Sequence, residues 1–206
     1  MNIKAVVFDY GQVISMPQDS EALDGLAKLA GVKREVYEPV FWSLRGDYDR
    51  GIISTKVYIG NILSQLGISL DEGTIDKMAA LDMSIWKKVN PETVALMEEI
   101  KRAGLRLGIL SNMPHEFLAW ARETVPVVSL VDTGLYSCEA NLAKPDEAIY
   151  RKLISLMGVE NSELVFFDDV AENVEGARAL GIEAFLWKDV ETARQNLADL
   201  GLNLTA

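Results

Sequence analysis

The sequence is poor in cysteine and has no long apolar run. Cys138 is the single cysteine among 206 residues, so no internal disulfide can form, which agrees with a reducing compartment. No apolar segment approaches the roughly 20 residues that a membrane-spanning helix needs. The short apolar start runs into Asp9 without a small-residue cleavage site, so no signal peptide is expected. We therefore expect a soluble, cytoplasmic protein without a membrane partner.

Positive charge is also scarce. The 20 Lys and Arg residues are outnumbered by 31 Asp and Glu residues, which gives a formal net charge of −11. Binding to nucleic acid depends on clustered cations that neutralise phosphates, so we expect no nucleic-acid partner. An acidic chain can still bind a small anion locally, through one or two cations, helix N-termini or a divalent metal. The hydrophobic content of 49% is ample for a core.

The chain shows two patterns of predicted secondary structure. Residues from Ser15 to about Lys88 have amphipathic spacing and few β-branched runs, which predicts helices alone. We expect these helices at Gln18–Ala30, Lys33–Arg45, Ser54–Leu66 and Leu70–Trp86.

From Asn90 onward, helical and strand patterns alternate. Helices are expected at Pro91–Ala103, Pro114–Glu123, Pro145–Met157, Val170–Leu180 and Val190–Leu200, and strands at Leu105–Leu110, Pro126–Val131, Leu164–Phe167 and Glu183–Leu186. Together with a strand before Asp9, this alternation predicts an α/β fold, a doubly wound, mostly parallel, Rossmann-like sheet with helices on both faces.

The helical block interrupts the alternating pattern after the first strand. We therefore expect residues 1–14 and 88–206 to form an α/β core domain and residues 15–87 to form an inserted all-α cap domain. The cap would cover the C-terminal edge of the sheet, where open α/β sheets bind ligands. Both a monomer and a homodimer are compatible with the sequence.

The strand before Asp9 ends in polar residues. Its apolar, mostly β-branched run stops at Asp9-Tyr10-Gly11, which places one carboxylate at the C-terminal tip of a buried strand. A carboxylate can attack phosphorus or an activated carbon when a cation or backbone dipoles orient it. Asp9 is therefore a candidate nucleophile, although a lone Asp at this position also serves as a turn cap.

Two later segments offer groups that bind an anion. Ser111 and Asn112 end a strand just before a helix that Pro114 would begin, so a hydroxyl, an amide and free N–H groups can face an anion there. Ordinary helix capping by Ser111 is the alternative. Lys144 precedes Pro145, which restricts its backbone to extended conformations, and it is a candidate fixed cation. Surface lysines are common, so this segment alone is not decisive.

A fourth segment places two acids at a strand tip. Asp168 and Asp169 follow an apolar strand, and adjacent carboxylates repel each other unless a cation or hydrogen-bond donors compensate. Mg²⁺ is a natural compensator because it prefers oxygen ligands. Helix capping by Asp169 is the alternative, and it explains one acid more easily than two.

These four segments, in this order and spacing, resemble the motifs of the haloacid dehalogenase-like hydrolase superfamily. The resemblance covers nearly the whole chain, and it lies in Asp9-Tyr10-Gly11, Ser111-Asn112, Lys144-Pro145 and Phe167-Asp168-Asp169 with Asn173. The branch with a helical cap after the first motif is the most similar, including small sugar-phosphate phosphatases and the N-terminal phosphatase domain of soluble epoxide hydrolases. The segment 45–54 is similar to a cap stretch of that branch.

The resemblance implies a role for each matched residue. Asp9 would attack phosphorus and become an aspartyl-phosphate, and Mg²⁺ would be held by Asp9, the Gly11 carbonyl and Asp169. The remaining matched residues would support the reaction: Ser111 and the Asn112 backbone would bind phosphate oxygens, Lys144 would neutralise Asp9 and the developing charge, and Asp168 and Asn173 would order the waters of the metal.

The chain departs from the family pattern at Gly11. Family phosphatases usually carry a second Asp there, as general acid for the leaving alkoxide and base for water. General acid–base help is typically worth about 10²–10⁴-fold in rate. A water or a cap residue such as Asp47 would have to replace it. In the cap, Trp42, Arg45, Asp47 and Tyr48 are the candidates to face the pocket.

Three functions therefore stay open. A Mg²⁺-dependent phosphatase of a small phosphorylated metabolite is favoured, because the pair Asp168-Asp169 has little purpose without a cation. The alternative enzyme is a metal-independent 2-haloacid dehalogenase acting on a halogenated substrate, for which Gly11 is suitable because halide needs no acid on leaving. A non-catalytic phosphate-binding protein is the third, and Gly11 is its only support.

Overall fold

A five-stranded parallel sheet forms the centre of the molecule. The computed structural model describes residues 2–202 and 204. The strands are β1 (Ala5–Phe8), β2 (Arg106–Ser111), β3 (Thr133–Tyr136), β4 (Leu164–Asp168) and β5 (Glu183–Leu186). They lie in the order β3-β2-β1-β4-β5, with every neighbouring pair parallel. The predicted doubly wound α/β class is confirmed.

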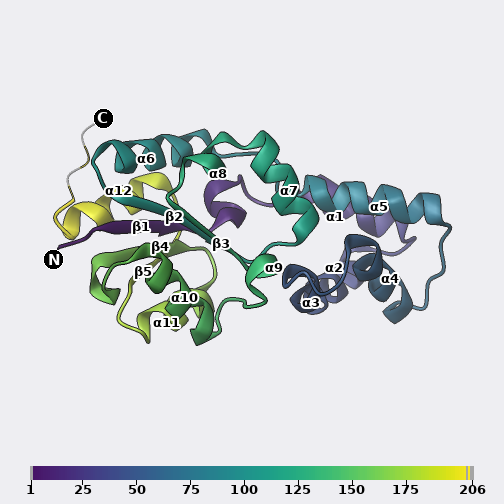
Figure 1. Ribbon diagram of the computed structural model, residues 1–206. Coiled ribbons are helices and arrows are strands. Elements are labelled where there is room, and N and C mark those ends of the chain that lie inside the picture. Colours follow the sequence, from purple (N-terminus) through teal and green to yellow (C-terminus); the bar gives the residue numbers. More distant parts are fainter. Residues whose placement is uncertain (1, 203, 205–206) are drawn as a thin grey trace.

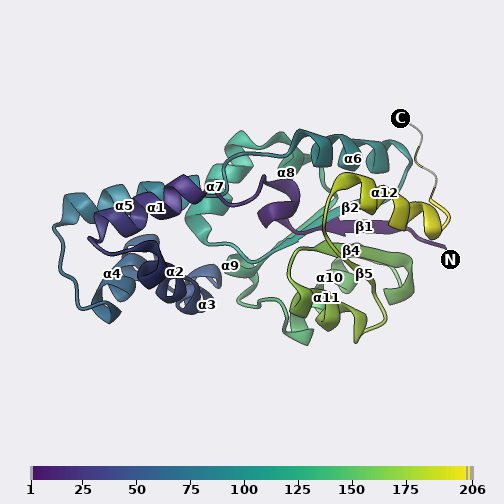
Figure 2. The ribbon, with the colours of Figure 1, turned by 180° about the vertical axis from the view of Figure 1, so that it is seen from behind.

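Helices cover both faces of this sheet (Figures 1 and 2). One face carries α6 (Pro91–Arg102), α7 (His115–Thr124), α8 (Pro126–Leu130) and α12 (Val190–Asp199), and the other carries α10 (Glu147–Met157) and α11 (Ala171–Arg178). The side chains of β1 alternate between the two faces of the sheet. Val6 and Phe8 pack in the apolar cluster on the first face, and Ala5 and Val7 pack in the cluster on the second. This two-sided burial explains why β1 is apolar throughout.

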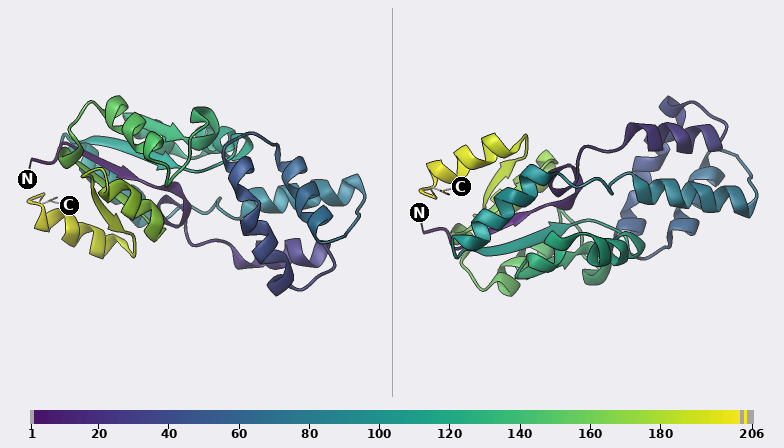
Figure 3. Two further views of the ribbon diagram at one scale, coloured as in Figure 1. Left: turned by 90° about the horizontal axis from the view of Figure 1, so that it is seen from below. Right: turned by 90° about the horizontal axis from the view of Figure 1, so that it is seen from above.

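A separate block of helices lies beyond one end of the sheet (Figures 1 and 3). It contains α1 (Ser20–Leu29), α2 (Arg34–Ser43), α3 (Arg45–Asp49), α4 (Thr55–Gln65) and α5 (Glu72–Ser84). These helices surround an apolar cluster of their own, which includes Leu23, Phe41 and Ile62. The C-terminal ends of the strands point toward this block (Figure 1).

The two chain segments that join the helical block to the sheet run side by side. Ser15 and Val89 form an antiparallel bridge. The backbone N–H of Met16 donates to the carbonyl of Lys88 at 2.7 Å, and that of Asn90 donates to Ile14 at 2.8 Å. Before the first segment, residues 10–14 form a wide helical turn that the sequence did not predict.

The predicted strand at Pro126–Val131 is wrong. Residues 126–130 form α8, and the third strand follows it at Thr133–Tyr136. Pro126 occupies the first turn of α8, where its missing N–H costs nothing, and Val127 and Val128 bury their side chains in the core. Tertiary burial therefore outweighs the strand preference of a β-branched run.

Smaller differences concern the ends of helices. The predicted helix Lys33–Arg45 is divided at Leu44, and Arg45 begins α3. Short helices also occur at Ser137–Ala140 (α9) and Asn161–Glu163. Among the described residues, none of the helices combines the length and apolar character that a membrane crossing requires.

The turn after α3 packs closely against the α/β part of the molecule. Gly51 has a φ of 73°, and a Cβ there would lie 2.6 Å from Nε2 of His115 and 2.9 Å from Cβ of Cys138. Next to it, Arg50 pairs with Asp146 at 3.1 Å. Gly51 is therefore required both by its backbone conformation and by the lack of space.

Replacing Gly51 by alanine tests this packing. Gly31 is the matched control, since its φ is 71° and an added Cβ would meet nothing within 4 Å. We expect Gly31→Ala to cost about 1 kcal/mol from the left-handed backbone alone. Gly51→Ala should cost about 1–3 kcal/mol more, because the neighbours must move. Urea unfolding measures both, and equal losses would contradict the close packing of Gly51.

Candidate active site

Asp9 emerges at the centre of the sheet edge. Phe8 pairs with Ile109 on one side and with Phe167 on the other, so the next residue lies between the ends of β2 and β4. The N–H of Asp9 still donates to the carbonyl of Phe167 at 2.9 Å. Its carboxylate oxygen Oδ1 accepts from the N–H of Tyr10 at 2.7 Å. The side chain is thus fixed at the tip of a rigid, buried strand.

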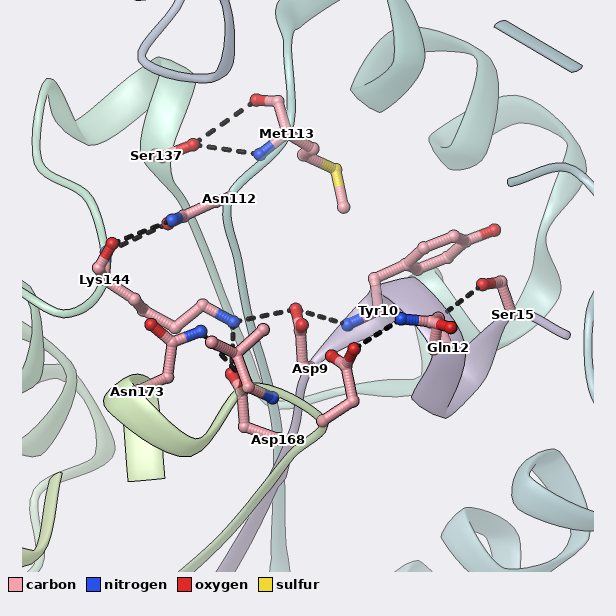
Figure 4. Close-up of polar contacts among 12 residues, drawn as sticks. Asp9, Tyr10, Gln12, Ser15, Asn112, Met113, Ser137, Lys144, Asp168 and Asn173 are labelled. Carbon is pink, nitrogen blue, oxygen red and sulfur yellow. Dashed lines mark hydrogen bonds and ion pairs between the residues drawn. The ribbon is translucent and has the colours of Figure 1, made fainter. Parts of the chain in front are cut away.

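Lys144 joins the acids of two neighbouring strands (Figure 4). Its ammonium Nζ lies 2.9 Å from Oδ1 of Asp9 and 2.5 Å from Oδ2 of Asp168, with 1% of the Lys144 side chain exposed. Burial alone would lower the pKa of Lys144, but the two carboxylates outweigh it, so the pKa is raised and the amine stays charged. The charged amine of Lys144 therefore lies between Asp9 and Asp168.

Asp168 has protein partners for both oxygens. Oδ2 accepts from Lys144, and Oδ1 accepts from the N–H of Val170 and from Nδ2 of Asn173, each at 2.9 Å (Figure 4). Asp168 is fully buried. These contacts make Asp168 the group that holds Lys144 in place, with Asn173 as its support.

Three carboxylates meet at this edge. One oxygen from each of Asp9, Asp168 and Asp169 lies within 4.8 Å of the others. Burial raises the pKa of Asp9 to about 7, against the lowering effect of Lys144, and burial together with Asp168 raises the pKa of Asp169. A single lysine therefore does not neutralise all three carboxylates of the site.

The donor set fits a hard divalent cation. Oδ2 of Asp9 accepts no hydrogen bond from the residues that the structure describes, and Gly11 lines the same cavity. Oδ2 of Asp169 accepts from Nε2 of Gln12 at 2.6 Å, and this acid lies close to Asp9. Carboxylate and carbonyl oxygens are the ligands that Mg²⁺ prefers.

Ser111 and Asn112 lie at the end of β2, next to Lys144. Ser111 is buried and lines the cavity. The side chain of Asn112 makes two hydrogen bonds to the backbone of Lys144, one accepted from its N–H and one donated to its carbonyl, both 3.0 Å long. The amide of Asn112 thus orients the lysine, and its backbone remains available to a ligand.

A cavity of about 240 Å³ lies between the sheet edge and the helical block. The side chains that line it from the sheet side include Asp9, Gln12, Ser111, Asn112, Phe117, Lys144, Asp169 and Asn173, and those from the helical block include Trp42, Arg45, Asp49, Asp82 and Trp86. All the predicted site residues therefore lie at or beside one cavity.

The residues of the helical block that face the cavity differ in part from those expected. Trp42 and Arg45 line the cavity as expected, but Tyr48 is buried behind it, with its hydroxyl on Asp82 at 2.8 Å. Asp47 is exposed and does not line the cavity. Asp49, two residues later, does line it, as do Gln12 and Asp82, and none of these three was predicted from the sequence. The spacing of Arg45 and Asp49, four residues apart on a helix, was the one signal for such an ion pair.

Comparison with known proteins identifies the family. A model of the haloacid dehalogenase-like hydrolase family matches residues 3–181. Phosphatase MT3486 of Mycobacterium tuberculosis is 32% identical over 193 residues, which cover 90% of this chain and 88% of the relative. The chain belongs to the haloacid dehalogenase-like hydrolases. It is an enzyme of the hydrolase class.

Solved structures share the fold. HAD family enzyme bt-2542 of Bacteroides thetaiotaomicron, in complex with magnesium and inorganic phosphate, has a TM-score of 0.71 at 22% identity, covering 90% of this chain and 94% of its own. L-2-haloacid dehalogenase of Xanthobacter autotrophicus, with chloropropionic acid covalently bound, has a TM-score of 0.68 at 20% identity, covering 99% and 85%. At these identities the likeness concerns the fold alone and does not separate the two chemistries.

Removing the cation tests the electrostatics of the site. Lys144→Met leaves Asp9 and Asp168 buried without their cation, so we expect a loss of about 3–5 kcal/mol in unfolding free energy at pH 8. Lys152→Met, an exposed lysine of α10, is the control and should change stability little.

The loss in Lys144→Met should shrink at pH 5. Lys144 lowers the pKa of Asp9, which is about 7 in the parent, so removing the lysine raises this pKa further. Both folded pKa values then lie above 5, so Asp9 is protonated in parent and variant alike at pH 5, and its part of the loss disappears as the pH falls from 8 to 5. Urea unfolding at both pH values measures this. An equal or larger loss at pH 5 would contradict the uncompensated buried acids.

Proposed function

We propose that the protein is a Mg²⁺-dependent phosphatase of a small phosphorylated metabolite, acting through an aspartyl-phosphate on Asp9. The observation that supports this most is the cluster of Asp9, Asp168 and Asp169 around a single lysine, which carries more negative charge than Lys144 neutralises. A phosphate dianion can approach such a site only with a further cation. The kinship with phosphatase MT3486 supports the same chemistry.

The proposed metal ligands are Asp9, the carbonyl of Gly11 and Asp169, with Asp168 and Asn173 around them. When bound, the ion would act as a Lewis acid on the phosphoryl oxygens and offset the charge between phosphate and carboxylates. Gln12 would keep Asp169 turned toward the site through its hydrogen bond.

The proposed reaction has two displacements at phosphorus. One carboxylate oxygen of Asp9 attacks phosphorus, a new oxygen–phosphorus bond forms, and the bond to the alkoxide leaving group breaks. The hydroxyl of Ser111 and the N–H of Asn112 hold phosphate oxygens, and Lys144 balances the charge of Asp9 and of the transferring group. Water then attacks phosphorus of the acyl phosphate, which releases inorganic phosphate and restores Asp9.

Because residue 11 is glycine, this position supplies no carboxylic acid to protonate the leaving group. The φ of −63° and ψ of 130° at Gly11 suit any residue, so the backbone does not impose glycine. A Cβ there would lie 3.7 Å from the ring of Trp86, in ordinary contact, so a longer side chain would meet this ring. The aromatic residue therefore stands beside the position of the missing carboxylate, and we expect water to protonate the alkoxide.

We also propose that residues 15–87 act as a cap over the site. The five helices of this segment share their own core, and Trp42, Arg45, Asp49, Asp82 and Trp86 from it close one side of the cavity. Substrate selection would then rest on this side, whereas the residues of the sheet edge carry the chemistry.

The dehalogenase remains the second candidate function, and one observation favours it. Halide leaves without a proton, so a site with Gly11 in place of an acid is chemically complete for attack on carbon. Dehalogenation does not need the carboxylate of Asp169, which lies close to that of Asp9.

Metal removal separates the two enzymes. With Mg²⁺, the protein should release phosphate from p-nitrophenyl phosphate, and excess EDTA should reduce the rate by at least about 100-fold, with recovery on adding Mg²⁺. The same preparation is tested with 2-chloropropionate and a halide electrode. Halide release that EDTA leaves unchanged would overturn the phosphatase proposal.

The nucleophile is tested by Asp9→Asn. An amide does not attack phosphorus, so we expect kcat to fall by at least about 1,000-fold. Asp47→Asn, which alters an exposed acid outside the cavity, should keep the parental kcat. Equal rates for Asp9→Asn and the parent would instead favour a non-catalytic phosphate-binding protein.

A further inference from the structure

The helical side of the cavity carries an ion-pair network of its own. Arg45 pairs with Asp49 through two contacts, of 3.2 Å from Nε and 2.6 Å from Nη2, and with Asp82 at 3.3 Å from Nη1. The exposed fractions of these side chains are 11%, 17% and 4%. All three residues line the cavity opposite the sheet edge.

Aromatic rings behind this network hold it in place. The guanidinium of Arg45 lies 4.9 Å from the ring centre of Tyr48, 5.4 Å from that of Phe41 and 5.5 Å from that of Tyr58. The hydroxyl of Tyr48 also donates to Asp82 at 2.8 Å. Cation–π contacts and two carboxylates together keep the arginine from turning to another anion.

Both cations of the cavity are paired with acids. Among the described residues that line it, Arg45 and Lys144 are the positively charged ones. Lys144 contacts Asp9 and Asp168, and Arg45 contacts Asp49 and Asp82. A substrate with a second anionic group, besides its phosphate, would therefore place that group against carboxylates without a cation to receive it.

Carboxylates are good partners for hydroxyl groups. Each carboxylate offers about four acceptor positions on its two oxygens. Asp49 accepts two hydrogen bonds from Arg45, while Asp82 accepts one from Arg45 and one from Tyr48. Acceptor capacity thus remains at the cavity wall, and hydroxyl hydrogens can use it.

We propose that the Arg45–Asp49–Asp82 network selects substrates whose leaving group is a small neutral polyol and rejects those that carry a second negative charge. This inference rests on the proposed phosphatase function. The cavity of about 240 Å³ is below the roughly 300–1,000 Å³ of sites for drug-sized ligands, which limits the size of the leaving group. Trp42, Trp86 and Phe117 supply apolar faces for its C–H groups.

A matched pair of substrates tests the selection. Glycerol 3-phosphate and 3-phosphoglycerate have the same three-carbon skeleton, but a neutral hydroxymethyl group in the first is a carboxylate in the second. We expect kcat/KM to favour glycerol 3-phosphate by at least about 100-fold, because buried acids accept hydroxyls and repel the carboxylate. Hydrolysis of p-nitrophenyl phosphate in the same assay reports the phosphatase activity itself.

Asp49→Asn tests the network directly. The amide keeps the size of the side chain and removes its charge, so the preference for glycerol 3-phosphate should fall by about 10-fold or more. Asp47→Asn removes the same charge two residues away, outside the cavity, and should keep the parental ratio. Melting temperatures check that both variants fold.

The possible results distinguish the two proposals. A parental ratio near one, or in favour of 3-phosphoglycerate, would overturn the selection by charge while leaving the phosphatase intact, and this result does not depend on any variant. An unchanged ratio in folded Asp49→Asn would likewise overturn the role of the network. Absence of hydrolysis with all three esters would overturn the proposed function, and the inference with it.

Discussion

The buried contact of Lys144 with Asp9 and Asp168 is the interaction on which the rest of the site depends. Two carboxylates at the ends of adjacent buried strands would each cost several kcal/mol to desolvate, and one ammonium ion between them offsets much of this cost. The N–H of Val170 and the amide of Asn173 satisfy the remaining oxygen of Asp168. Asp9 is left with one oxygen, Oδ2, that accepts no hydrogen bond from the described residues.

Charge in the cavity is arranged as two networks on opposite walls. The sheet edge carries Lys144 with its acids, and the helical block carries Arg45 between Asp49 and Asp82. In both networks the acids outnumber the cation, which keeps each cation fixed. In the proposed reaction the sheet edge would hold the phosphate and the helical wall would face the leaving group, so that different parts of the chain would carry chemistry and selection.

The sequence was sufficient for the parts of the fold that depend on local pattern. The apolar run before Asp9 and the acids after β4 predicted strand ends, and a parallel sheet necessarily brings such ends to one edge. Residues 126–130 were predicted wrongly because Val127 and Val128 favour a strand, and only their burial in the core makes them helical. Gln12, Asp49 and Asp82 were not predicted, because their roles depend on partners that lie 157, 4 and 37 residues away along the chain. Of these three contacts, only that of Asp49 with Arg45 has a sequence signal, the spacing of four residues on a helix.

Covalent transfer of the phosphoryl group to Asp9 can be measured by peptide mass spectrometry during turnover. The protein is mixed with Mg²⁺ and p-nitrophenyl phosphate, quenched in acid within the first turnover and digested. We expect the peptide containing Asp9 to gain the mass of one phosphoryl group, and borohydride reduction to convert this residue to homoserine. Release of phosphate with no phosphoryl group on Asp9, or with the group on another residue, would contradict this covalent transfer.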